Sequence, residues 1–153
     1  DDAGFNDALL AVNINGYWGL LNQRIRLVAE PVFDWTDDGY DGLARATRHG
    51  KTGFLQGNGH WRFEPEFSEI DRFENGFAVF RGPDSRYGYL DKAKKIRHEP
   101  EFVAALRFKD GRAAVQVGDR LGYLDLRMQL VTPLSFTAAR SFHEGLAAVR
   151  LAQ

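Results

Sequence analysis

The sequence Tyr87-Gly88-Tyr89-Leu90-Asp91 recurs 34 residues later as Leu121-Gly122-Tyr123-Leu124-Asp125. The Gly within it marks four copies of one unit, and further anchor residues follow each Gly at nearly constant spacing. The anchors are this Gly (Gly19, Gly53, Gly88, Gly122), a Pro (Pro31, Pro65, Pro100, Pro133), a Phe (Phe33, Phe67, Phe102, Phe136), a second aromatic residue (Tyr40, Phe73, Phe108, Phe142), a second Gly (Gly42, Gly76, Gly111, Gly145) and an Ala (Ala44, Ala78, Ala113, Ala147). A period of 34 or 35 residues predicts a repeat architecture.

Each copy predicts three antiparallel strands joined by turns. Residues 113–117 and 121–125 are rich in β-branched, aromatic and aliphatic residues and flank a Gly-containing turn, which is typical of a hairpin. A third strand, such as residues 60–64, ends at the Pro, because proline has no amide hydrogen to donate to a neighbouring strand. We therefore expect a meander of an Ala strand, a Gly strand and a Pro strand, each named for the anchor that it carries. Only few helical residues are expected, in short turns such as 69–74 or 140–144.

A three-stranded meander of about 34 residues is too small to bury its own apolar face, so the copies are expected to stack on one another. The two recurring aromatic positions predict the core between them. These core residues are Phe33, Phe67, Phe102, Phe136, Tyr40, Phe73, Phe108 and Phe142. The recurring Gly of the Gly strand predicts a close approach of backbone or a kink, because glycine otherwise weakens the interior of a strand.

The two ends of the sequence bear on whether the array is open or closed. Residues 5–12 resemble residues 73–80 and predict an additional Ala strand, and residues 145–151 form another. This gives thirteen expected strands with duplicated rather than complementary ends. The pattern favours an all-β, open, curved, solenoid-like array over a propeller-like or barrel-like closure. We expect a single repeat domain over residues 1–153, with an extra strand within 5–16 and repeats at 17–50, 51–85, 86–119 and 120–153.

The order and spacing of the anchors resemble the bacterial WG repeat, also called the KWG repeat, over nearly the whole chain. The first copy keeps Trp18-Gly19 itself, whereas the residue before the Gly is Thr52, Tyr87 or Leu121 in the others. The resemblance implies a β-rich repeat module from a family without an agreed biochemical activity.

Composition excludes several classes of function. A net charge of −1 argues against nucleic-acid binding, which requires an excess of Lys and Arg. No apolar run approaches the ~18 residues that a membrane-spanning helix needs. The absence of Cys excludes disulfides and leaves both the bacterial cytoplasm and the periplasm open. Because the sequence begins with Asp1 rather than Met, we expect that a signal peptide or an upstream region has been removed.

The sequence contains no recognisable catalytic motif, and we predict no catalytic residue, metal ligand or cofactor. The four histidines occupy different positions in their copies. Residues 34–42 are rich in carboxylates, as a calcium loop would be, but they lack the bidentate Glu of an EF-hand, so a solvated acidic turn is favoured. Carboxylate pairs for sugar hydrolysis could be drawn from Glu64, Glu66, Asp91 or Glu99, which leaves an unrecognised hydrolase as one alternative function.

The favoured interpretation is a non-enzymatic module that binds another protein, because repeat arrays present extended faces built from equivalent positions. In a bacterium, such a partner could be a toxin or a secreted effector that the chain neutralises as an immunity protein. Aromatic and Arg side chains anchor interfaces, so we predict partner contacts at Trp35, Asp37, Asp38, Trp61 and Arg62. An accessory domain that binds peptidoglycan or another glycan through the same aromatics is a further alternative.

Overall fold

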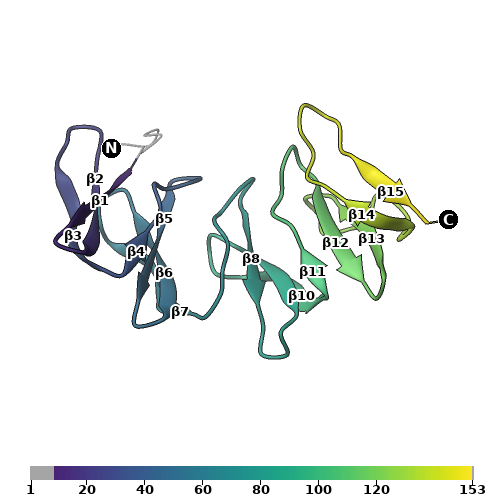
Figure 1. The fold of residues 1–153 in the computed structure, drawn as a ribbon, viewed down its shortest axis with the longest axis horizontal. Coiled ribbons are helices and arrows are strands. Elements are labelled where there is room, and N and C mark those ends of the chain that lie inside the picture. The colour runs from purple at the N-terminus through teal and green to yellow at the C-terminus, as the bar shows by residue number, and fades with distance from the viewer. Residues whose placement is uncertain (1–8, 153) are drawn as a thin grey trace. The chain divides into compact units, whose positions relative to one another are not determined.

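A computed structural model of the chain describes residues 9–152 and consists there of strands, turns and loops, without helix (Figure 1). Its strands form four antiparallel sheets, and none of these sheets is closed into a barrel. The strands are β1 (Leu10–Ile14), β2 (Tyr17–Leu21), β3 (Leu27–Phe33), β4 (Trp35–Thr36), β5 (Leu43–Arg48), β6 (Lys51–Gln56), β7 (Trp61–Phe67), β8 (Phe77–Arg81), β9 (Tyr87–Asp91), β10 (Ile96–Phe102), β11 (Ala104–Ala105), β12 (Ala113–Val117), β13 (Arg120–Leu124), β14 (Phe136–Ala139) and β15 (Val149–Leu151). The predicted all-β array of antiparallel meanders is confirmed.

The chain divides into two compact units, residues 1–72 and 73–153. The first unit contains a sheet in the order β1-β2-β3 and a sheet in the order β4-β5-β6-β7. The second unit contains a sheet in the order β10-β9-β8 and a sheet in the order β11-β12-β13-β14-β15. The prediction of a single domain over 1–153 stays a prediction. Of the predicted first strand, residues 5–8 lie outside the described residues, and β1 forms its continuation.

The Ala strands β1, β5, β8 and β12 each pair with the following Gly strand in the same register. The residue two positions after the anchor Ala lies opposite the Gly, as Ala46 does with Gly53 and Val115 with Gly122. A tight turn precedes the Ala strands β5, β8, β12 and β15. Each turn contains the second anchor Gly of its copy. This Gly and the residue before it both have positive φ, for example 74° at Gly111 and 51° at Asp110. Such a pair closes a two-residue turn, as expected of a Gly preceded by Asn, Asp or Glu.

The Gly of the Gly strand lies against a bulge in the Pro strand. In β9 and β10, Tyr87 pairs with Phe102 and Tyr89 with His98, so a step of two residues along β9 matches a step of four along β10. A Cβ atom built on Gly88 would lie 2.5 Å from the carbonyl oxygen of His98. The first two copies have the same arrangement. The predicted close approach of backbone is therefore confirmed in three copies, and the bulge also accommodates a Pro without a ladder hydrogen bond.

The fourth copy differs, and its Pro strand is not formed as predicted. Its Pro133 comes 11 residues after the Gly instead of 12, although Phe136 keeps the usual spacing of 14. Here an isolated bridge joins Leu124 to Leu130, the Val131 N–H donates to the carbonyl oxygen of Tyr123 (2.8 Å), and the hydroxyl of Thr132 accepts a hydrogen bond from the Tyr123 N–H (3.0 Å). The side-chain hydroxyl thus replaces a backbone partner where the shifted Pro interrupts the ladder.

Three short strands, β4, β11 and β14, were not predicted. Each follows the anchor Phe or begins at it and pairs with the next Ala strand, as Ala104 does with Gln116 and Ala138 with Arg150. The chain therefore passes directly from one sheet into the next within each unit. This connection brings consecutive sheets together so that they share a core.

The two cores draw on equivalent positions of the repeat, although several of these positions carry different residues. In the second unit, Tyr89 and Phe102 of one sheet pack with Phe108, Val115 and Leu124 of the segment and sheet that follow. The first unit has a corresponding cluster in which Leu20 and Phe33 pack with Ala44, Ala46 and Leu55. Stacking of neighbouring copies is thus confirmed within each unit.

The predicted core residues divide into three groups. Phe33, Phe73, Phe102 and Phe108 are buried as predicted, and Phe67, Phe136 and Phe142 are half-buried. Tyr40 is exposed, so its assignment to the core was wrong. Its ring instead lies under a guanidinium group, as described below.

Candidate functional site

The carboxylate of Asp37 fixes the loop that precedes β5 to the strand itself. Its Oδ1 accepts hydrogen bonds from the backbone N–H groups of Gly39 (3.0 Å) and Arg45 (2.9 Å), and its Oδ2 accepts one from the Arg45 Nε (2.8 Å). Only 8% of the Asp37 side chain is exposed. A carboxylate that accepts three N–H bonds, one of them from a cation, is fully satisfied by the protein itself.

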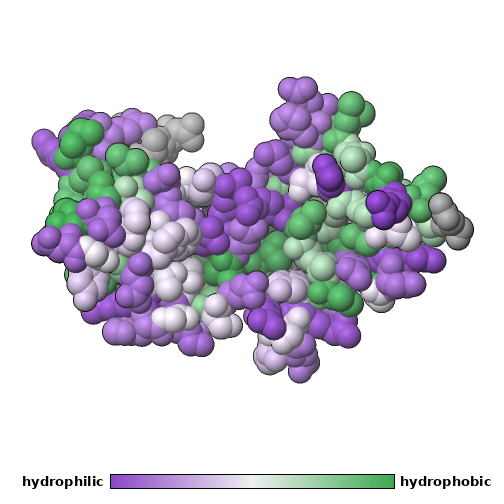
Figure 2. Space-filling view, viewed as in Figure 1, coloured by the Kyte–Doolittle hydropathy of each residue, from purple (hydrophilic) through white to green (hydrophobic). Residues whose placement is uncertain are grey.

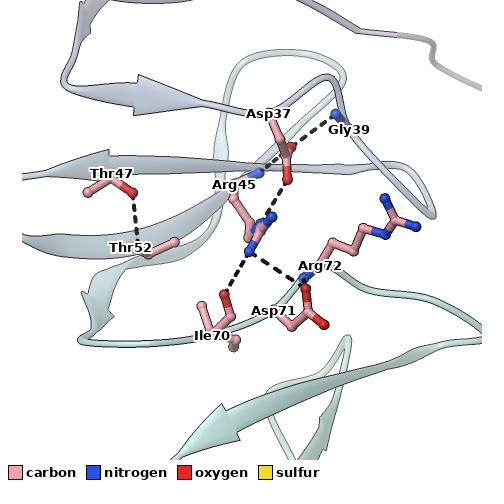
Figure 3. Close-up of polar contacts among 8 residues, drawn as sticks. All are labelled: Asp37, Gly39, Arg45, Thr47, Thr52, Ile70, Asp71 and Arg72. Carbon is pink, nitrogen blue, oxygen red and sulfur yellow. Dashed lines mark hydrogen bonds and ion pairs between the residues drawn. The ribbon is translucent and has the colours of Figure 1, made fainter. Parts of the chain in front are cut away.

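Arg45 is the centre of this arrangement (Figure 3). Beyond Asp37, its NH1 group donates to the carbonyl oxygen of Ile70 (3.0 Å) and lies 3.8 Å from Oδ1 of Asp71. Its guanidinium carbon also lies 5.1 Å from the centre of the Trp35 ring. The side chain is 20% exposed, so its charge is largely desolvated and is balanced by two carboxylates. Arg45 therefore fixes Trp35 relative to the segment before the second unit.

The guanidinium group of Arg72 stacks on the ring of Tyr40, which follows Trp35 closely in the sequence. The guanidinium carbon of Arg72 lies 3.8 Å from the centre of the Tyr40 ring. The Trp35 and Tyr40 residues remain 40% and 39% exposed. We define Trp35, Asp37, Tyr40, Arg45, Asp71 and Arg72 as the Arg45 cluster. It combines two exposed aromatic rings with two arginines that hold them in place.

The five contact residues predicted from sequence do not form one group. Trp35 and Asp37 are joined through Arg45. The Oδ1 of Asp38 accepts a hydrogen bond from the backbone N–H of Ala11 in β1 (2.9 Å), so this carboxylate also serves the fold. Trp61 packs edge-on against Phe33 at 5.6 Å, beside the core of the first unit.

Arg62 lies exposed on β7. Whether any of the five predicted residues contacts a partner is not tested by these geometries and stays a prediction. Among the described residues, no group of three or more His, Asp or Glu side chains is arranged to hold a metal ion.

Arg45 was not among the residues predicted from the sequence, although the repeats contain a signal that identifies it. The position after the anchor Ala is Val79, Ala114 or Ala148 in the other copies. An arginine in an apolar column of a repeat requires a partner for its charge, because burial of an unpaired charge is costly. Comparison of equivalent positions would therefore have marked Arg45 as exceptional.

One carboxylate considered for hydrolysis, Asp91, serves a turn. Its Oδ1 accepts hydrogen bonds from the backbone N–H groups of Ala93 and Lys95, both at 2.9 Å. Burial of the carboxylate opposes its ionisation, but the Lys95 and Ala93 N–H groups and the Arg97 guanidinium outweigh it and lower the pKa of Asp91. A general acid requires the opposite shift.

Asp125 repeats this turn in the fourth copy. The backbone N–H of Gln129 lowers its pKa against a smaller desolvation penalty, and the N–H of Arg127 adds to the effect. Two equivalent aspartates with lowered pKa values point to a structural role that recurs with the repeat.

No described helix is long and apolar enough to cross a membrane.

A family model described as WG containing repeat matches the chain four times, at residues 18–51, 53–81, 87–120 and 122–152. None of the curated protein sequences compared with the chain matches it. Among solved structures, the chain is similar to the computationally designed Ika8 protein, with a TM-score of 0.53 and 11% identity. The match covers 97% of this chain and 54% of the designed one, so the chain spans about half the length of that protein. At this level of identity, the similarity concerns the fold alone.

Proposed function

Because this chain belongs to the family of WG containing repeats, we propose that it is a non-catalytic repeat module that binds another protein, and that the Arg45 cluster is part of its contact surface. Residues that dominate binding energy at protein interfaces are enriched in Trp, Tyr and Arg. The cluster supplies each of these types within one compact unit. Apart from Tyr40, its members are not among the anchors of the repeat, and Tyr40 itself is exposed rather than packed in the core.

The observation that carries this proposal is the combination of exposure and rigidity at Trp35 and Tyr40. Each ring keeps about two fifths of its surface exposed, at 40% and 39%, while a guanidinium lies against it. A side chain that is already held in one position loses less conformational entropy when a partner binds. Large aromatic side chains with few rotatable bonds are effective contacts for the same reason.

The two alternative functions receive less support from this geometry. A sugar ring stacks on an open aromatic face, and guanidinium groups already lie over both rings. For a hydrolase, the lowered pKa of Asp91 is the wrong direction for a proton donor. A toxin-neutralising role is one specific form of the proposed function, and it depends on the identity of the partner.

The test begins with affinity capture of a partner by the chain and identification of that partner by mass. The purified partner is then titrated by calorimetry against the wild type, Trp35→Ala and Tyr40→Ala. Loss of a contact of this kind is expected to weaken binding by about tenfold or more. The matched control is Tyr17→Ala, which removes an aromatic residue that is 53% exposed on β2 and lies outside the cluster. If the captured partner is a toxin, inhibition of its activity by the chain would establish the immunity role.

Equal affinity for the wild type and both cluster variants would remove the Arg45 cluster from the contact surface. Turnover of a substrate by the purified chain would refute the non-catalytic proposal itself.

A further inference from the structure

The turn that follows the Gly strand has the same structure in the third and fourth copies. In the third copy, the Asp91 N–H donates to the carbonyl oxygen of Lys95 (3.0 Å). The fourth copy repeats this bond between the Asp125 N–H and the carbonyl oxygen of Gln129 (2.9 Å). Each turn and the two residues after it form what we call a tip segment. The two tip segments of the second unit are residues 91–97 and 125–131.

Each tip segment begins at the end of its sheet where the Ala strand starts. The register pairs Phe77, the first residue of β8, with Asp91, the last residue of β9. In the next sheet, Ala113 at the start of β12 pairs with Leu124 at the end of β13. The turn that precedes each Ala strand therefore lies beside the tip segment of the same copy.

The two tip segments lie on one side of the second unit. The Gly111 N–H, in the turn before β12, donates to Oδ1 of Asn75, in the turn before β8 (2.9 Å). This bond joins the corresponding ends of the two sheets. The hairpin turns at 82–86 and 118–119 lie at the opposite ends of the same strands. The second unit therefore has a tip side and a hairpin side.

Positive charge is concentrated in the tip segments, although the chain as a whole has a net charge of −1. The tip segments contain two carboxylates and five cations, which are Lys92, Lys94, Lys95, Arg97 and Arg127. Both carboxylates, Asp91 and Asp125, accept hydrogen bonds from backbone N–H groups of their own turns. The neighbouring turns at 74–76 and 109–112 add two cations and two carboxylates. An excess of three positive charges therefore remains on the tip side.

Aliphatic side chains are exposed in the same segments. Ile96 is 45% exposed in the first tip segment, and Leu126 and Leu130 are 43% and 47% exposed in the second. Figure 2 shows hydrophobic residues interspersed with hydrophilic ones at the surface of this unit. The corresponding turn of the first copy exposes Ile25 by 73%. Ile25 and Ile96 belong to copies that are followed by another copy, so this exposure is a property of the tip position.

We propose that the tip side of the second unit binds a membrane surface that contains anionic lipids. Lys and Arg side chains are attracted to an anionic leaflet. Exposed aliphatic side chains gain free energy when they are buried at the boundary between headgroups and acyl chains. The positive charge and the exposed aliphatic residues of the tip segments are therefore complementary to such a surface.

The composition of the tip segments favours a lipid surface over a protein or a nucleic acid. Three of their five cations are lysines, and Lys is depleted at protein interfaces, where Arg and aromatic residues are enriched. Binding of single-stranded nucleic acid uses aromatic rings on which bases stack, and neither tip segment contains Phe, Tyr or Trp. The Arg45 cluster of the first unit has the opposite character, with arginines and aromatic rings.

The experiment is co-sedimentation of the full chain with vesicles. Vesicles of phosphatidylcholine and phosphatidylglycerol in equal parts should bind the chain, whereas vesicles of phosphatidylcholine alone should not. Raising the salt concentration from about 0.1 M to about 1 M shortens the Debye length from about 10 Å to about 3 Å and should release the chain. Combining Lys92→Gln, Lys94→Gln and Lys95→Gln should weaken partitioning by about tenfold or more.

Matched controls are placed on the hairpin side. Combining Arg81→Gln, Arg86→Gln and Arg120→Gln gives the same net charge as the triple lysine variant and should retain partitioning within about twofold. Leu126→Gln should weaken partitioning by about threefold or more, because it removes an aliphatic side chain from the lipid contact. Val117→Gln removes a side chain of similar exposure, 45%, from the hairpin side and should have no effect. Circular-dichroism melts establish that each variant is folded.

Absence of binding to the anionic vesicles at low salt would overturn the proposal, as would equal binding to phosphatidylcholine alone. Equal losses in the two triple variants would show that net charge decides binding, and would overturn the assignment to the tip side. Tight binding of heparin that displaces the chain from vesicles and is unaffected by Leu126→Gln would assign the tip side to a soluble polyanion instead. The tip side belongs to the second unit and the Arg45 cluster to the first, so failure of either proposal leaves the other standing.

Discussion

Replacing Phe102 by Ala should destabilise the second unit by about 3–5 kcal/mol, because the side chain is buried between two sheets. Phe102 is 5% exposed and packs with Tyr89, whose ring centre lies 6.2 Å away, and with His98, which stacks at 4.2 Å. It also belongs to the cluster that Val115 and Leu124 contribute from the next sheet. The substitution therefore loses the free energy gained by burying the ring and leaves a cavity between the two sheets.

The repeat provides its own matched control in Phe136→Ala. Phe136 occupies the equivalent position in the fourth copy but is only half-buried, so its loss should cost about 1–2 kcal/mol. Both variants are compared with the wild type by urea unfolding monitored by circular dichroism and by thermal melts. For a cooperative unit as small as residues 73–153, each kcal/mol corresponds to a shift of about 4–8 °C in Tm.

Two results would refute the reasoning. A Phe102→Ala variant within about 0.5 kcal/mol of wild type would behave like an ordinary surface substitution, and the assigned core would be wrong. Equal costs for Phe102→Ala and Phe136→Ala would show that the two positions are covered to the same extent.

Further predictions concern the bulge and the turns. Gly88→Ala should destabilise the second unit by about 1–3 kcal/mol in urea unfolding, because its Cβ would meet the backbone of His98. Gly122→Ala should cost less, because its nearest contacts, the end of the Leu134 side chain and the carbonyl oxygen of Pro133, both lie 3.2 Å away; equal costs would contradict the role of the bulge. Since the pKa values of Asp91 and Asp125 are lowered in the folded chain, their contribution to stability is complete above the unfolded pKa of about 3.9 and is lost as pH falls through the folded values. Asp91→Asn should therefore reduce the loss of stability in melts below about pH 4, and an unchanged pH dependence would contradict this.

Features set by neighbours in the sequence were predictable, whereas features set by distant segments were not. The turn before each Ala strand follows from a Gly that adopts positive φ, and the order of the three strands follows from the repeat. The short strands β4 and β11 consist of two residues each, and only their pairing with a later Ala strand defines them. No local pattern identifies a two-residue strand, so these elements could not be read from the sequence.

Two of the predictions that failed have a cause that is visible in the sequence. Tyr40 lies two residues before its Gly, whereas Phe73, Phe108 and Phe142 lie three residues before theirs. Its bridge to Leu43 corresponds to the bridges of Glu74, Lys109 and His143, so Tyr40 occupies a surface position and Gly39 stands at the position of the Phe. The shift of Pro133 by one residue was equally visible and explains the lost Pro strand of the fourth copy. In both cases the departure from the repeat carried more information than the repeat itself.

The candidate site, unlike the fold, depends on positions where one copy differs from the others. The predicted acidic contacts, Asp37 and Asp38, accept hydrogen bonds from backbone N–H groups, so a charge reversal there would disturb the entry to β5 as well as any binding. Trp35 provides a cleaner probe, because its ring is exposed and is held by Arg45, a residue found in this column only in the copy that contains the cluster. Positions that all copies share are committed to packing. A function particular to this chain must therefore depend on positions where one copy differs from the rest, and Arg45 is the clearest of these.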